Sequence, residues 1–223
     1  MHEHRIAVRR TARYYTLGGG DSPPAEVWIA CHGYGQLARR FLRAFEPVAG
    51  PDRLVAAPEA LSRFYLDDAL KVHGPDSRVG ATWMTREDRL TEIEDYVRYL
   101  DRVHDAVRGG APGAARVVAF GYSQGAATAS RWAALGEAQP DALILWCGLL
   151  PPDLDPGAPA RWAARGLAVT LVVGRGDAFT PPDRVAEQER RLREAGVACR
   201  VVWFDGGHEL HAETLRAVAA GRG

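Results

Sequence analysis

Short apolar runs alternate along the chain with longer segments of mixed polarity, from the first third of the sequence to its end. The apolar runs are rich in Val, Leu, Ile and Trp, and they predict buried strands. The longer segments predict helices that cover these strands. Strands that alternate with helices form a mostly parallel sheet with helices on both faces. We therefore predict an α/β fold whose twisted sheet has about six to seven strands.

The same pattern sets the expected boundaries of the strands and helices. The expected strands span residues 27–31, 54–57, 116–120, 142–147, 168–173 and 199–204. The expected helices span residues 37–48, 86–108, 126–136, 182–195 and 208–220. In the helix over 86–108 the apolar residues recur three or four positions apart and so share one face. These residues are Leu90, Ile93, Val97, Leu100, Val103 and Val107.

Three segments depart from the alternation. Residues 6–17 predict an antiparallel strand at the edge of the sheet, followed by a turn at 18–24. Residues 61–85 lack a clear periodicity and predict a short insertion over the functional site, and residues 151–159 form a proline-rich loop. No internal repeat or second domain is visible, so we expect residues 1–223 to form a single domain.

Charge and cysteine content narrow the range of functions. The 28 Lys and Arg residues balance the 28 Asp and Glu residues, so charge does not favour binding to nucleic acid or to an anionic membrane. No apolar run approaches transmembrane length, and the N-terminus has no apolar core of a signal peptide, so we expect a cytoplasmic protein. Cys31, Cys147 and Cys199 fall in expected strands as buried free thiols, which argues against a disulfide framework or a metal site. The sequence does not indicate an oligomeric state.

The most informative stretch is Gly-Tyr-Ser-Gln-Gly at residues 121–125, directly after an expected strand. A strand that enters Gly-x-Ser-x-Gly and then a helix forms the nucleophile elbow of α/β-hydrolases. The glycines are needed because a Cβ at either position would collide with the neighbouring strand or helix, while the serine is held in a strained conformation. We expect Ser123 at the N-terminus of a helix, whose dipole favours developing negative charge. The alternative is an ordinary turn with a surface serine.

A serine hydroxyl is a poor nucleophile at neutral pH, so it needs a base, and the base needs an orienting carboxylate. In α/β-hydrolases these residues follow in the order Ser, Asp or Glu, and His, each after a later strand. Asp177 ends the sequence Gly-Arg-Gly-Asp after the strand at 168–173, and His208 ends Asp-Gly-Gly-His after the strand at 199–204. We therefore assign Asp177 as the acid and His208 as the base.

Other candidates fit this order less well. His32 also follows a strand, but it precedes the elbow and fits better in an oxyanion loop. His211 is expected on the final helix, and Asp205 is the alternative acid, although it lies too near His208 in sequence for the usual geometry.

The glycine-rich turn at residues 32–36, His-Gly-Tyr-Gly-Gln, follows the strand at 27–31. Such a turn can direct a main-chain N–H toward the tetrahedral intermediate, and the residue after the nucleophile supplies a second one. We therefore expect an oxyanion hole formed by the main-chain N–H groups of Tyr34 and Gln124.

These motifs together resemble α/β-hydrolases of the phospholipase/carboxylesterase type, which include bacterial carboxylesterases and acyl-protein thioesterases. The matching segments are residues 32–35, 80–83, 121–125, 174–181 and 206–208. The resemblance implies a serine hydrolase without a cofactor or a metal ion. Gln36 and Ala126 stand where many members have an acidic residue and a glycine, which leaves the subfamily and the substrate open.

The preferred function is that of a carboxylesterase-type serine hydrolase, which cleaves small-molecule carboxylic esters through an acyl-enzyme. We expect short-to-medium acyl esters, with thioesters as a further class. Trp83, Leu149, Leu150 and Phe179 fall on segments that should border the site, where they could form a groove or simply pack. An acyltransferase or peptidase on the same triad stays open, as does a non-catalytic binding module of this fold.

Overall fold

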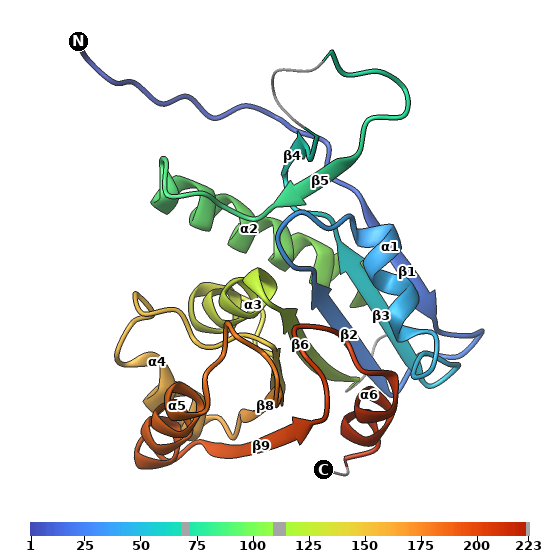
Figure 1. Ribbon diagram of the computed structural model, residues 1–223, viewed down its shortest axis with the longest axis vertical. Helices are drawn as coiled ribbons and strands as arrows, with labels where there is room; N and C mark the ends of the chain where they lie inside the picture. Colours follow the sequence, from blue (N-terminus) through green and yellow to red (C-terminus); the bar gives the residue numbers. More distant parts are fainter. Residues whose placement is uncertain (68–71, 109–114, 222–223) are drawn as a thin grey trace.

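The computed structural model, which describes residues 1–67, 72–108 and 115–221, is built on a seven-stranded sheet in the order β1-β3-β2-β6-β7-β8-β9 (Figure 1). The strands are β1 (Tyr14–Gly18), β2 (Glu26–Cys31), β3 (Arg53–Pro58), β6 (Arg116–Tyr122), β7 (Ala142–Trp146), β8 (Ala168–Gly174) and β9 (Ala198–Phe204). Neighbouring strands run parallel except at the edge, where β1 pairs antiparallel with β3. The predicted α/β fold with a mostly parallel sheet is confirmed.

Helices cover both faces of this sheet. They are α1 (Ala38–Leu42), the 3-10 turn η1 (Arg43–Phe45), α2 (Arg89–Arg108), α3 (Gln124–Leu135), α4 (Ala158–Ala164), α5 (Pro182–Glu194) and α6 (Ala212–Ala219). Buried side chains of α2, α3, α4 and α5 belong to one core cluster, and those of α1, η1 and α6 belong to the other. None of the helices in the described part of the chain is long and apolar enough to cross a membrane.

Strand β2 shows why the sheet needs helices on both sides. Val27, Ile29 and Cys31 face the first cluster, whereas Trp28 and Ala30 face the second. Successive side chains of a strand point to opposite faces, so an uninterrupted apolar run buries both of them.

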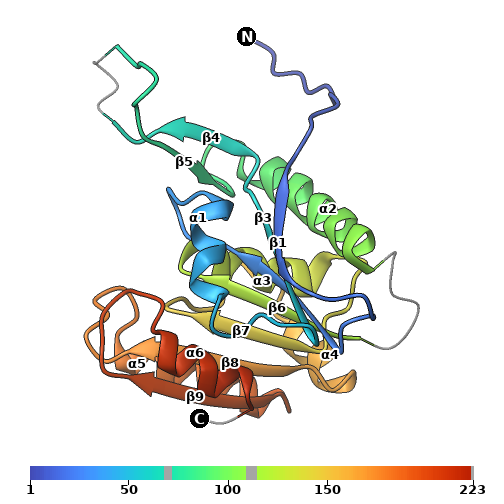
Figure 2. The same cartoon turned by 90° about the vertical axis from the view of Figure 1, so that its right-hand side faces the viewer.

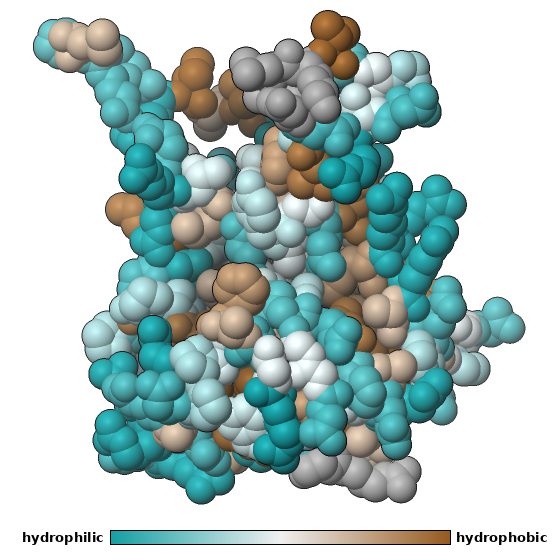
Figure 3. All heavy atoms as spheres, in the orientation of Figure 1, coloured by the Kyte–Doolittle hydropathy of each residue, from teal (hydrophilic) through white to brown (hydrophobic). Residues whose placement is uncertain are grey.

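The segment expected as an insertion contains a small hairpin of strands β4 (Ser62–Tyr65) and β5 (Val79–Thr82). Its residues 68–71 lie outside the described part. Strand β5 contacts the loop after β2, because Gly35 N–H donates to Ala81 O at 2.9 Å. The hairpin stands beside α1 and apart from β8 and β9 (Figure 2). Apolar side chains are exposed around its tip, among them Leu66 and Val72 (Figure 3).

Several predicted boundaries need correction. The edge strand occupies Tyr14–Gly18 instead of 6–17, and the helix expected at 37–48 is divided between α1 and η1. The final helix starts at Ala212, four positions later than expected, with His211 as its N-cap.

Burial corrects three further expectations. Leu90 lies in the first turn of α2 and is 70% exposed, so it does not belong to the buried face of that helix. Helix α4 begins at Ala158, within the segment expected as a proline-rich loop, and was not predicted. Cys31 and Cys147 are buried, but Cys199 is only half-buried because β9 lies at the edge of the sheet.

Candidate active site

Ser123 occupies the sharp turn between β6 and α3. Its backbone has φ 55° and ψ −118°, a left-handed value that side chains rarely adopt. A Cβ on Gly121 would lie 2.2 Å from the Gly125 carbonyl oxygen, and a Cβ on Gly125 would lie 2.1 Å from the Cys31 carbonyl oxygen. The two glycines therefore allow the strand and helix to approach closely enough to hold the serine in this conformation.

Three side chains from three loops form a continuous line of hydrogen bonds. His208 Nε2 lies 2.8 Å from Ser123 Oγ. On the other side of the ring, His208 Nδ1 lies 3.0 Å from both carboxylate oxygens of Asp177. Because a carboxylate only accepts, Nδ1 is the protonated nitrogen, and Nε2 is free to accept the serine proton. The structure thus brings Ser123, His208 and Asp177 together at the carboxyl ends of β6, β8 and β9.

The Asp177 carboxylate has no solvent-exposed surface. Burial alone would raise its pKa, but hydrogen bonds from Thr180, His208 and the Phe179 N–H outweigh burial and hold the pKa below its usual range. Thr180 Oγ1 donates at 2.6 Å and the Phe179 N–H donates at 2.9 Å. The site therefore holds an ionised carboxylate against the imidazole. Sequence reasoning missed Thr180, whose only signal is a hydroxyl three positions after the acid.

The loop that presents His208 is anchored from the neighbouring strands. Tyr122 Oη donates to His208 O at 2.7 Å, and Trp146 Nε1 donates to Glu209 O at 2.7 Å. The Cys147 thiol contacts the same loop, with its sulfur 3.7 Å from Gly207 O. The sulfur also lies within 4.8 Å of a carboxylate oxygen of Asp177 and a ring nitrogen of His208. Burial raises the Cys147 pKa to about 12, so the thiol stays protonated and donates to the loop. Sequence reasoning placed Cys147 in a strand and missed its position beside the acid.

The competing candidates lie elsewhere. Asp205 is exposed and pairs with Arg175 at 3.2 Å. The His211 ring caps α6, where its Nδ1 accepts from Thr214 N–H, and it stacks on Phe204. In the described part of the chain, no hydrogen bond, ion pair or ring contact joins either of these two residues to Ser123 or His208.

His32 is completely buried, and both of its ring nitrogens have main-chain partners. Its Nδ1–H donates to Gly33 O at 2.8 Å, while its Nε2 accepts from Ala60 N–H at 3.1 Å. Trp83 packs against this ring and donates from Nε1 to His32 O at 2.8 Å. Trp83 was expected to border the substrate groove, but it is 2% exposed and lies in the core behind the loop.

The two groups expected to form the oxyanion hole lie on segments that other contacts hold in place. The Gln124 side chain accepts from Trp83 N–H at 3.2 Å and donates to Met84 O at 3.0 Å, which ties the start of α3 to the end of the hairpin. Gly33 N–H donates to Gln36 Oε1 at 2.8 Å and so fixes the turn that contains Tyr34. Within the described residues, the main-chain N–H groups of Tyr34 and Gln124 donate to no protein acceptor.

A pocket of about 430 Å³ opens beside His208. Its apolar walls come from the segment of α1 and η1, the hairpin and the loop after His208: Leu37, Phe41, Ala44, Leu66, Val79 and Leu210. Sequence reasoning missed these residues, because apolar positions on a short helix look the same whether they face the core or a cavity.

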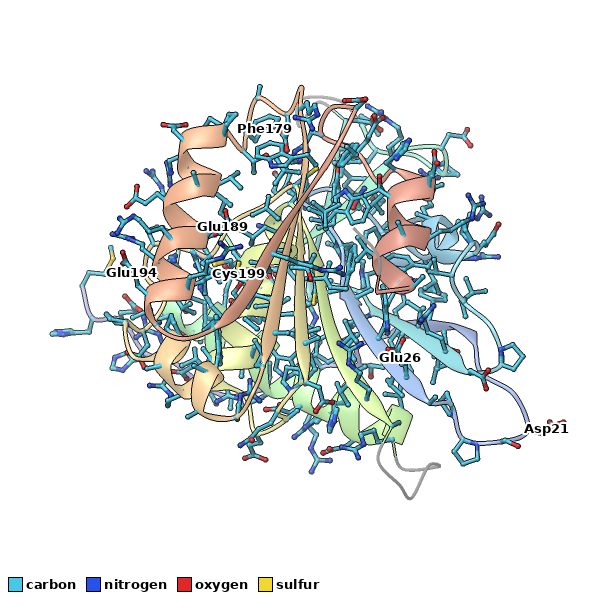
Figure 4. All side chains as sticks on the ribbon, turned by 90° about the horizontal axis from the view of Figure 1, so that it is seen from below. Asp21, Glu26, Phe179, Glu189, Glu194 and Cys199 are labelled. Atoms are coloured by element: carbon cyan, nitrogen blue, oxygen red, sulfur yellow. The ribbon has the colours of Figure 1, made fainter. Side chains whose placement is uncertain are left out.

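The remaining residues expected in the substrate groove lie outside this pocket. Phe179 is 78% exposed, and its ring lies 4.8 Å from that of His208 at a tilt of 60°, at the end of the sheet opposite Glu26 (Figure 4). Leu149 and Leu150 are half-buried against the core, and Leu150 N–H donates to Gln188 Oε1 at 3.0 Å.

The fold and the serine at the strained elbow define an α/β-hydrolase of the serine hydrolase class. Residues 32–214 match the serine hydrolase (FSH1) family, and the chain belongs to that family. This match confirms the predicted resemblance to a family of serine hydrolases.

The carboxylesterase from Mesorhizobium loti is 18% identical and has a TM-score of 0.69, covering 94% of this chain and 95% of its own. Zea mays acyl-protein thioesterase 2 is 17% identical with a TM-score of 0.68, covering 95% of this chain and 97% of its own. These two likenesses show the shared fold. A protein of Bacillus subtilis (strain 168) named "Putative hydrolase MhqD" is 29% identical over 128 residues, 55% of this chain and 56% of that protein. The match thus spans about half the length of this curated relative.

Proposed function

We propose that the chain is a carboxylesterase-type enzyme in which Ser123 is the nucleophile, His208 the general base and Asp177 the orienting acid. The observation that supports this proposal is the line of hydrogen bonds from Ser123 Oγ to His208 Nε2 at 2.8 Å and from His208 Nδ1 to Asp177 at 3.0 Å. The order Ser, Asp, His along the chain is that of α/β-hydrolases.

The reaction follows from these positions. His208 Nε2 accepts the hydroxyl proton as Ser123 Oγ attacks the ester carbonyl, and Asp177 stabilises the resulting imidazolium. The main-chain N–H groups of Tyr34 and Gln124 donate to the oxyanion of the tetrahedral intermediate. His208 then gives its proton to the departing alcohol, leaving an acyl group on Ser123. A water molecule, deprotonated by the same nitrogen, releases the acid.

The pocket favours esters with short-to-medium acyl chains. Its volume of about 430 Å³ lies in the lower part of the range for small-molecule sites, and its walls are mainly apolar. Thioesters form the same acyl-enzyme and are the second substrate class to test. Transfer of the acyl group to an alcohol or amine requires only that this acceptor replace water.

The test combines covalent labelling with a substrate series. A fluorophosphonate probe should label the wild-type protein, and Ser123→Ala should abolish labelling and lower kcat by roughly 10⁴ to 10⁶ without loss of folding. Ser22→Ala, at an exposed serine in the loop before β2, is the matched control. A series of C2 to C12 p-nitrophenyl esters, acyl thioesters and added alcohol acceptors then defines the reaction. Retention of most ester hydrolysis in Ser123→Ala would refute the assignment.

A further inference from the structure

One charged side chain interrupts the mostly apolar lining of the pocket from the α1 side. Arg40 lines the pocket together with Leu37 and Phe41 of the same segment. Among the described residues, no carboxylate forms an ion pair with Arg40. Arg40 is exposed, so its side chain keeps contact with solvent while it lines the pocket.

The carboxylate that also lines the pocket, Glu209, is directed toward its own loop. Its Oε1 lies 3.4 Å from the Gly207 N–H, and a Cβ added to Gly206 would lie 2.7 Å from the same oxygen. Glu209 therefore folds back on the loop after β9 and leaves the Arg40 guanidinium available.

The position of Arg40 relative to the reacting atoms suggests what it would bind. His208, Tyr122 and Arg40 line the same pocket, together with apolar residues from the α1 segment, the hairpin and the loop after His208. A chain attached to the ester at Ser123 would run along these walls and bring its far end to the guanidinium. An arginine is always charged, and its planar fork matches a carboxylate with two parallel hydrogen bonds.

We propose that this hydrolase selects esters whose chain ends in a carboxylate, and that Arg40 is the specificity-determining residue. The inference rests on the proposed esterase function and names the substrate class of the same site. The carboxylate could belong to the acyl chain or to the alcohol chain, and both present the same chemistry to Arg40.

The experiment compares charged esters with neutral partners of equal length. The acyl arm uses monoethyl adipate against diethyl adipate. The alcohol arm uses 6-(butanoyloxy)hexanoate against its methyl ester. Hydrolysis is followed by product chromatography. We expect the charged member of at least one arm to have a kcat/KM about 10- to 100-fold higher, as a charge-assisted hydrogen bond provides. The difference should lie mainly in KM.

Variants connect this preference to the residue. Arg40→Gln should reduce the ratio of charged to neutral kcat/KM to about one, and Arg40→Lys should restore part of it because it keeps the charge without the fork. Arg39→Gln removes the neighbouring arginine, which is also exposed but does not line the pocket, and should keep the wild-type ratio.

Two results would overturn the inference: a ratio of one or less in both arms of the wild type, or an equal loss in Arg39→Gln and Arg40→Gln. In either case Ser123-dependent cleavage of neutral esters would leave the proposed function intact. Hydrolysis that persists in Ser123→Ala would instead refute the proposed function itself.

Discussion

Two histidines lie at the carboxyl ends of strands in the same sheet, but they differ in burial and in hydrogen-bond partners. His32 follows β2 and His208 lies beyond the end of β9, so both stand at the carboxyl ends of parallel strands. The His32 residue has no exposed surface, whereas the His208 side chain is 25% exposed. His32 is bonded to the main chain of Gly33 and Ala60, and His208 is bonded to the side chains of Ser123 and Asp177.

This difference shows that the partners of the two nitrogens separate a structural histidine from a candidate base. A general base needs one nitrogen held by an acceptor and the other directed at the proton it removes. Both His32 nitrogens are committed to main-chain groups, and burial lowers its pKa, so the ring stays neutral and joins the loop after β2 to the segment after β3. His208 keeps one nitrogen on the nucleophile.

The largest effect is expected from removing the candidate base. His208→Ala should lower kcat for ester hydrolysis by roughly 10⁴ to 10⁶, nearly as much as loss of the serine, because the serine proton then has no acceptor. Steady-state rates on p-nitrophenyl butyrate at neutral pH measure the effect. His211→Ala is the matched control, since this residue caps α6 and should cost little activity. Equal losses in the two variants would contradict the choice of His208.

The second effect concerns the residue that orients the base. Asp177→Asn should lower kcat by roughly 10⁴, because an amide next to Nδ1 favours the wrong tautomer of His208. Asp205→Asn removes the alternative acid, which is exposed and paired with Arg175, and should leave kcat close to the wild-type value. A larger loss in Asp205→Asn than in Asp177→Asn would reverse the assignment.

The sequence predicted the parts of this site that depend on local rules. The elbow at Ser123 could be recognised because its glycines are required by contacts of 2.2 Å and 2.1 Å that any Cβ would make. Asp177 and His208 could be selected as candidate partners of Ser123 because the carboxyl ends of parallel strands lie at one end of a sheet. For the same reason the α/β fold followed from the alternation of apolar and mixed segments.

The parts that the sequence did not predict depend on packing between distant segments. Trp83 looked like a wall of the site, yet its indole packs on His32 and Tyr96 in the core. Arg40 was not singled out, because nothing in the sequence shows that α1 and the loop after His208 line one pocket. Such contacts join elements far apart in the chain, so no local pattern reports them.

The third effect is expected at the structural histidine, where His32→Ala should lower the stability of the protein much more than its catalytic rate. His32→Ala removes a ring that packs on Trp83 and Phe41 and leaves the buried Ala60 N–H without its acceptor. We expect a loss of about 2–4 kcal/mol in the free energy of unfolding, measured by urea denaturation. At a temperature where the variant is folded, kcat should fall far less than in His208→Ala. A loss of activity as large as that of His208→Ala, with unchanged stability, would make His32 a catalytic residue. The two histidines would then not differ in role.

The smallest effect is the pH dependence that His32 gives to folding. Burial is the main cause that lowers the pKa of His32, and it outweighs the Gly33 carbonyl and the charge of Glu59, which act in the opposite direction. As the pH falls below the ordinary histidine pKa of about 6.5, His32 binds a proton in the unfolded chain but not in the folded chain. Stability should therefore fall on acidification, and this one group should contribute up to about 1.4 kcal/mol per pH unit.

Urea denaturation at pH 7.5, 6.5 and 5.5 measures how the free energy of unfolding depends on pH. His32→Gln keeps an oxygen that can accept from the Ala60 N–H but has no proton to gain, so the slope of the unfolding free energy against pH should be shallower than in the wild type. His2→Gln, at an exposed N-terminal position, should keep the wild-type slope. The pKa of Asp177 is lowered, so its contribution is present above the ordinary carboxyl range and is lost only at much lower pH, outside this window. An identical slope in the wild type and His32→Gln would show that the buried ring accepts a proton in the folded state, and the two histidines would then differ less than their contacts imply.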